Sequence, residues 1–165
     1  MLRSSQARVH DERRARTHGS RQDERRFTSA AALQAVCVVA LAGMAYCHIK
    51  DVGMKFDEHV YYMAMLFCCN IAASLLLIPA VIVYGNGHDR RARAVWMAAG
   101  ALSLLTMAGF FWSRTIGFPQ MQDHVGEWDA LGLTSVAFES LIVALSAWRL
   151  APTGVLVAST RVGAR

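Results

Sequence analysis

The chain has 165 residues, of which 55% are hydrophobic, and its formal net charge is +5. The apolar residues form four long runs and the charged residues lie between them, which is typical of a membrane protein and not of a soluble domain. The basic balance does not indicate nucleic-acid binding, because the cations gather at one predicted membrane face. All four cysteines fall within apolar runs, so we expect no disulfide framework.

The two ends of the chain are predicted to be cytoplasmic tails. Residues 1–27 contain eight arginines and four acidic residues but almost no large apolar side chains. Such a segment buries too little surface to fold, so we predict that it is disordered. Residues 151–165 form the second tail. Arginine outnumbers lysine 15 to 2, which we interpret as the codon bias of a GC-rich, bacterial genome.

The four apolar runs predict four transmembrane helices. We place these helices at residues 28–49, 60–84, 94–113 and 130–148. Each run is close to the ~20 residues that cross a hydrocarbon core, and none has the wide polar face of a helix in a soluble bundle. The predicted fold class is therefore all-α, with residues 28–150 forming a four-helix transmembrane bundle of up-down-up-down order.

The charge distribution predicts the orientation of this bundle. The two tails and the 85–93 loop carry 14 cations, counting Arg149, whereas the other side has only Lys50, Lys55 and Arg114. By the positive-inside rule, the tails and the 85–93 loop face the cytoplasm. We therefore expect a multi-pass protein of the plasma (inner) membrane with both termini cytoplasmic.

A few polar residues lie inside the predicted spans, where they are costly and therefore informative. Glu139 interrupts the fourth run, and Ser135 lies on the same helix face. Asn70 on the second helix has a similar depth, and Ser103 and Thr106 form a polar face on the third. Two interpretations stay open: a set of hydrogen bonds that fixes helix register, or a site for a proton or a ligand.

A second group of candidate residues lies at the predicted outer face. His48 and Asp51 are three residues apart at a helix end, and His59 and His124 lie in the outer loops. A borderline metal such as zinc accepts these ligand types, but their spacing matches no zinc motif. The alternative is a solvated acidic rim.

Arg114 is the isolated cation at the end of the third run. It lies near two acidic residues of the following loop, Asp123 and Glu127. We expect an ion pair within this loop, with lipid phosphate or an anionic ligand as the alternative partner.

Several short segments resemble a group of small four-span bacterial membrane proteins, mostly from actinobacteria. The resemblance rests on His48, on residues 65–73 (MLFCCNIAA), on residues 113–119 (SRTIGFP) and on residues 131–135 (LGLTS) leading to Glu139. It covers roughly residues 30–150. It implies the same topology and singles out the same polar residues, but it implies no activity.

The sequence gives no indication of an enzyme, since no Walker motif, nucleophile elbow or H-E-x-x-H site occurs, and it favours a protein without catalytic activity. We expect an accessory or partner-binding subunit of a membrane complex, without a cofactor. Its partners would be the lipid bilayer and a membrane protein or a second copy of the chain. Two alternatives stay open: a small carrier or proton-coupled transporter that uses Glu139 and Asn70, and a metal or haem site at the outer face.

Overall fold

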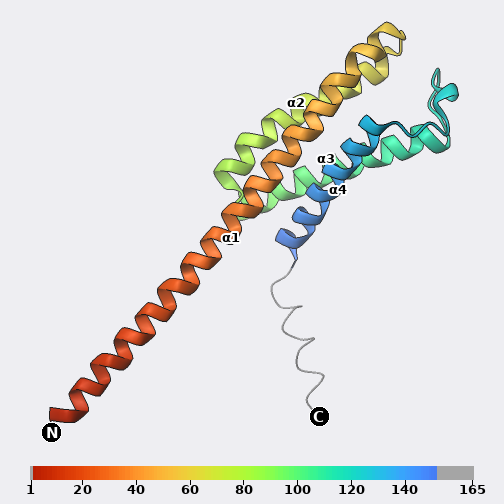
Figure 1. Cartoon of the computed structure of the whole chain (residues 1–165). Helices are drawn as coiled ribbons and strands as arrows, with labels where there is room; N and C mark the ends of the chain where they lie inside the picture. The colour runs from red at the N-terminus through yellow and green to blue at the C-terminus, as the bar shows by residue number, and fades with distance from the viewer. Residues whose placement is uncertain (1, 152–165) are drawn as a thin grey trace. The chain divides into compact units, whose positions relative to one another are not determined.

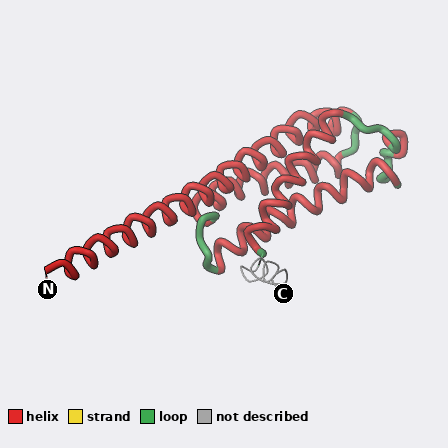
Figure 2. Tube along the Cα trace, turned by 60° about the horizontal axis from the view of Figure 1, so that its bottom comes forward, coloured by secondary structure: helices red, strands yellow, loops and turns green. Residues whose placement is uncertain are grey.

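A computed structural model describes the backbone of residues 2–151 and the side chains of residues 29–122 and 124–151. Within this part of the chain the structure is helical and contains no strand (Figure 1, Figure 2). Its elements are α1 (Leu2–Asp57), α2 (Tyr61–Tyr84), α3 (Arg90–Thr115), the short 3-10 helix η1 (Gln122–His124) and α4 (Ala130–Leu150). Four segments are long and apolar enough to cross a membrane, the first being Ser29–Asp57 of α1. The predicted all-α fold with four such helices is confirmed.

The chain divides into two units, residues 1–33 and 34–165, which are described separately. In the first unit the backbone is helical from Leu2 onward, whereas the sequence predicts disorder in residues 1–27. Arginine, glutamine, glutamate and alanine all favour the helix, and the segment contains no proline. The predicted tail at 151–165 lies outside the described residues apart from Ala151.

The helix ends differ from the predicted ends, because helices stop at caps and turns and not at the first charged residue. α1 continues through residues 50–57, which the sequence assigns to an outer loop, and the connection to α2 is only residues 58–60. His59 makes this tight turn with a φ of 61°. α3 begins at Arg90, four residues before the predicted start, because the Asp89 side chain accepts a hydrogen bond from the Ala92 N–H at 3.0 Å.

The second unit buries many small and polar side chains beside a few large apolar ones such as Leu41 and Ile142, and it exposes many large apolar side chains. Ala99 and Ser103 are fully buried, whereas Leu76 and Val83 on α2 are 74% and 68% exposed. Large apolar side chains on the outside and small residues at the helix contacts are typical of helices that face lipid. The chain is therefore a small multi-pass membrane protein.

The closest helix packing joins α3 to α4. A Cβ atom added to Gly100 would lie 3.0 Å from the Ser146 Cβ atom, so the two backbones approach too closely for a larger residue. Both residues are buried. α3 also packs against α2, so it contacts a helix on either side.

We call the two ends of the bundle the Arg114 end and the Arg149 end. At the Arg114 end, a small apolar cluster attaches the 116–129 connection to the start of α2. The cluster consists of Val60, Met63, Phe67, Phe118 and Met121. The Tyr62 hydroxyl adds a hydrogen bond to the Pro119 carbonyl oxygen. The connection after α3 is therefore held over the bundle.

At the Arg149 end, polar contacts tie α4 to the connection between α2 and α3. The Arg149 guanidinium donates to the carbonyl oxygens of Gly85 at 2.7 Å and Gly87 at 3.1 Å. The Trp96 indole N–H also donates to the Gly85 oxygen, at 2.9 Å. These contacts satisfy carbonyl groups that the end of α2 leaves without helical partners.

Candidate functional site

A cavity of about 390 Å³ lies between the helices in the half of the bundle nearer the Arg114 end. All four helices contribute to its wall, and apolar side chains make up most of it. Most of the predicted polar residues line it: His48, Asp51, Asn70, Thr106, Arg114, Ser135 and Glu139. A mostly apolar cavity with a few convergent polar groups is the usual form of a small-molecule site.

Glu139 is the most deeply buried of these polar residues. It lies nine residues beyond the start of α4 at Ala130, which is roughly 13 Å along the helix, and its side chain is 1% exposed. Its Oε1 atom accepts a hydrogen bond from the Ser135 hydroxyl at 2.9 Å. Its Oε2 atom has no hydrogen-bonding partner among the described residues. This cavity-lining residue therefore has one oxygen whose hydrogen-bonding capacity is unused within the described residues.

Asn70 and Thr106 join α2 to α3 across the same cavity. The Asn70 Nδ2 group donates to the Thr106 hydroxyl oxygen at 2.7 Å, and the Thr106 hydroxyl donates to the Leu102 carbonyl oxygen at 2.8 Å. The Ser74 hydroxyl donates to the Asn70 carbonyl oxygen at 2.8 Å. Of the predicted hydrogen bonds between helices, the structure therefore contains the one between Asn70 and Thr106.

The set of hydrogen bonds differs from the predicted set in two respects. Glu139 bonds to Ser135 on its own helix and not to Asn70 or Thr106. Ser103 does not line the cavity; it is fully buried, and its hydroxyl has no partner among the described residues. The sequence locates these residues at similar depths, but it does not determine which rotamers bring them into contact.

His48 and Asp51 lie on α1 where the cavity approaches the Arg114 end. The His48 Nδ1 atom is 2.9 Å from the Met44 carbonyl oxygen, and the ring lies edge-on to Phe67 with the two centroids 5.0 Å apart. His48 is thus held by its own helix and by α2. Asp51 is partly buried and has no ion-pair partner within the described part of the chain.

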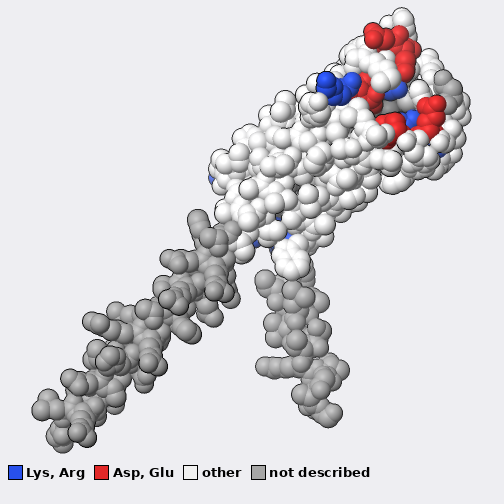
Figure 3. Space-filling model, in the orientation of Figure 1, with Lys and Arg blue, Asp and Glu red and all other residues white. Residues whose placement is uncertain are grey.

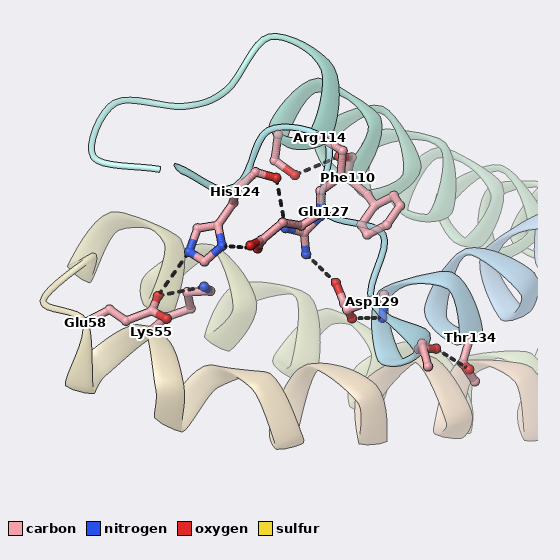
Figure 4. Close-up of polar contacts among 11 residues, drawn as sticks. Lys55, Glu58, Phe110, Arg114, His124, Glu127, Asp129 and Thr134 are labelled. Carbon is pink, nitrogen blue, oxygen red and sulfur yellow. Dashed lines mark hydrogen bonds and ion pairs between the residues drawn. The ribbon is translucent and has the colours of Figure 1, made fainter. Parts of the chain in front are cut away.

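Arg114 forms part of an ion network at the Arg114 end (Figure 4). Its guanidinium pairs with Asp129, which also accepts a hydrogen bond from the Gly132 N–H at 2.6 Å and so caps α4. His124 lies 2.9 Å from Glu127 and 3.8 Å from Glu58. The sequence predicts Glu127 or Asp123 as the partner of Arg114, whereas the structure pairs it with Asp129, which holds the start of α4 near the end of α3.

Charged side chains gather at this end of the bundle, while the remainder of the visible surface is almost free of them (Figure 3). The three outer histidines are not brought together here. The His59 ring lies edge-on to Tyr61 with the ring centroids 5.8 Å apart, and of the three only His48 lines the cavity. Among the described side chains, no three of His, Cys, Asp and Glu form a group that could hold a metal ion.

The sequence interpretation overlooks Lys55 as a cavity residue. Lys55 is 5% exposed, lines the cavity, and donates to the Glu58 carboxylate at 2.7 Å. It follows His48 and Asp51 at steps of three and four, which is one helix face. The spacing would reveal it only if α1 were known to continue beyond residue 49.

Comparisons with protein-family models, with curated proteins and with solved structures gave no match. The class of the protein therefore rests on its own helices.

Proposed function

We propose that the protein is a small carrier that binds its substrate in the cavity beside Glu139 and Asn70. The observation that carries this proposal is a buried carboxylate with one free oxygen, in the wall of a cavity of about 390 Å³. Ionisable residues inside membrane spans are costly and mark substrate or ion pathways. A cavity of this size lies within the range that holds small organic molecules.

The proposal includes an orientation in a bacterial plasma membrane. The Arg114 end faces outward, and both termini and the 85–89 connection face the cytoplasm. The support is the charge asymmetry, since 14 of the 17 Lys and Arg residues belong to the tails and the segment around Arg90. In this orientation the cavity lies in the outer half of the membrane.

Cysteine accessibility tests the proposed function. In a variant without the four native cysteines, Ser135→Cys should react with a membrane-impermeant thiol reagent added outside, because a substrate cavity must admit water and solutes. A carrier must also open to the other side, so the same cysteine should react in inside-out vesicles. The rates are measured by the mass shift of the labelled protein.

Ala137→Cys is the matched control. Ala137 is exposed on the same helix, two residues away, and does not line the cavity. It should stay unlabelled, because lipid does not support the reactive thiolate. If Ser135→Cys reacts from neither side, the cavity is not a substrate site; if it reacts from one side only, the protein binds but does not carry.

The alternative of an accessory subunit stays a prediction. The exposed apolar side chains within the described residues fit lipid as well as a protein partner. Native electrophoresis after mild solubilisation separates the two functions: a carrier runs as a monomer or a homo-oligomer, whereas an accessory subunit runs with other proteins.

A further inference from the structure

We infer that the ligand of this cavity is an organic cation, a protonated amine on an apolar body. This inference rests on the proposed function and names its substrate class. Three observations carry it: the surplus of hydrogen-bond acceptors at the deep end, the pairing of the charges around the cavity, and the size and lining of the cavity.

The deep end of the cavity offers acceptors and uses most of its donors internally. The hydroxyl of Ser135 donates to Glu139, the Thr106 hydroxyl donates to Leu102, and one Asn70 N–H donates to Thr106. The Glu139 Oε2 atom remains without a donor among the described residues. When Glu139 is ionised, this oxygen is a buried acceptor without a partner, which is costly, so a donor from the ligand would complete the site.

The charges around the cavity also favour a cation. Each cation that lines it already has an acidic partner: Lys55 pairs with Glu58 at 2.7 Å, and Arg114 pairs with Asp129. The carboxylate of Glu139 lines the cavity without an ion-pair partner in the described part of the chain, whereas Asp51 has Lys55 and Arg114 near it. A cationic ligand compensates this excess negative charge, and charge-assisted hydrogen bonds are the strongest kind.

The size of the cavity excludes a bare proton or metal ion as its full occupant. A volume of about 390 Å³ accommodates an organic molecule of one or two rings. Phe67, Leu102 and Phe110 provide an apolar and partly aromatic wall. The ligand thus has an apolar body, and its ammonium group also gains from nearby aromatic faces.

The alternative ligand is an anion, which would bind near Arg114. Its Nε atom is buried and has no acceptor among the described residues, so an anionic group near the Arg114 end would also find a donor. Asp129 neutralises this guanidinium, however, while the Glu139 carboxylate has no such partner. We therefore place the organic cation first and include an anion in the test.

The test uses three probes with one naphthyl body: 1-naphthylmethylammonium, 1-naphthalenemethanol and 1-naphthoate. Their binding to the full-length protein in lipid nanodiscs is measured by calorimetry. The ammonium probe should bind about 10- to 100-fold more tightly than the other two, which is the value of a charge-assisted hydrogen bond. Glu139→Gln should remove this preference and leave binding of the neutral probe unchanged, which also shows that the variant is folded.

Asp57→Asn is the matched control, because Asp57 is an exposed carboxylate at the end of α1 that does not line the cavity. It should keep the wild-type preference. Tighter binding of naphthoate or naphthalenemethanol, or an ammonium preference that survives Glu139→Gln, overturns the inference. Binding of the neutral or anionic probe alone contradicts the organic-cation inference but not the proposed carrier function. If no probe binds and Ser135→Cys is also unreactive, both the inference and the proposed function are wrong.

Discussion

Burying a carboxyl group in a membrane-spanning helix costs free energy, and the hydrogen bonds of Glu139 within the described residues offset only part of this cost. One oxygen is satisfied by Ser135 a single turn away, and the other has no partner among the described residues. A residue that served only to lock helix register would pair with a neighbouring helix, as Asn70 does with Thr106. The proposed ligand site rests on this half-satisfied carboxyl group and on its place in the cavity wall.

Thr106→Val tests the structural role of the Asn70 contact at the residue scale. The substitution keeps the side-chain shape but removes the hydroxyl that Asn70 donates to, at 2.7 Å. Interhelix hydrogen bonds in membranes contribute about 0.6 kcal/mol on average and under about 2 kcal/mol at most. We expect a loss of that size in the free energy of unfolding, measured by denaturation in mixed micelles.

Thr134→Val is the control for this change. The Thr134 hydroxyl is exposed and donates only to the Ala130 carbonyl of its own helix, at 2.7 Å. This variant should unfold at the wild-type free energy. If both variants lose the same free energy, the Asn70 contact contributes nothing specific to the joining of α2 and α3.

At the scale of the elements, Gly100 allows α3 and α4 to approach closely at Ser146. Gly100→Ala would place a methyl group 3.0 Å from the Ser146 Cβ atom, which cannot move without its helix backbone. We expect a loss of about 1 kcal/mol or more in the free energy of unfolding, as for other overpacked sites.

Gly109→Ala on the same helix is the comparison, because an added Cβ there meets nothing within 4 Å. Alanine also favours the helix over glycine. This variant should be as stable as the wild type or slightly more stable. Equal destabilisation by the two substitutions would mean that helix propensity, and not packing against Ser146, sets the cost.

At the scale of the whole molecule, the charged residues make the orientation testable. In the variant without native cysteines, Gln120→Cys should react with an impermeant thiol reagent added to intact cells, and Asn86→Cys should react only after the membrane is opened. Both residues are exposed in connections, at the Arg114 end and the Arg149 end respectively. The reverse pattern would show that the arginine-rich tails do not orient the bundle and would place the cavity on the cytoplasmic side.

The sequence by itself determines the four membrane-crossing helices and the identity of the polar residues inside them. Hydropathy and helix length are local properties, and polar residues stand out against an apolar run. The charge asymmetry between the two faces is also local, although the orientation that it predicts awaits the labelling test.

Only the tertiary structure decides how these residues meet. It extends α1 through Lys55, pairs Arg114 with Asp129, and separates Ser103 from the cavity that Asn70 and Glu139 share. The physical reason is that cavities and hydrogen-bond partners depend on helix spacing and rotamers, which packing sets across segments distant in the chain. The free oxygen of Glu139 is therefore a property of the bundle and not of its fourth helix.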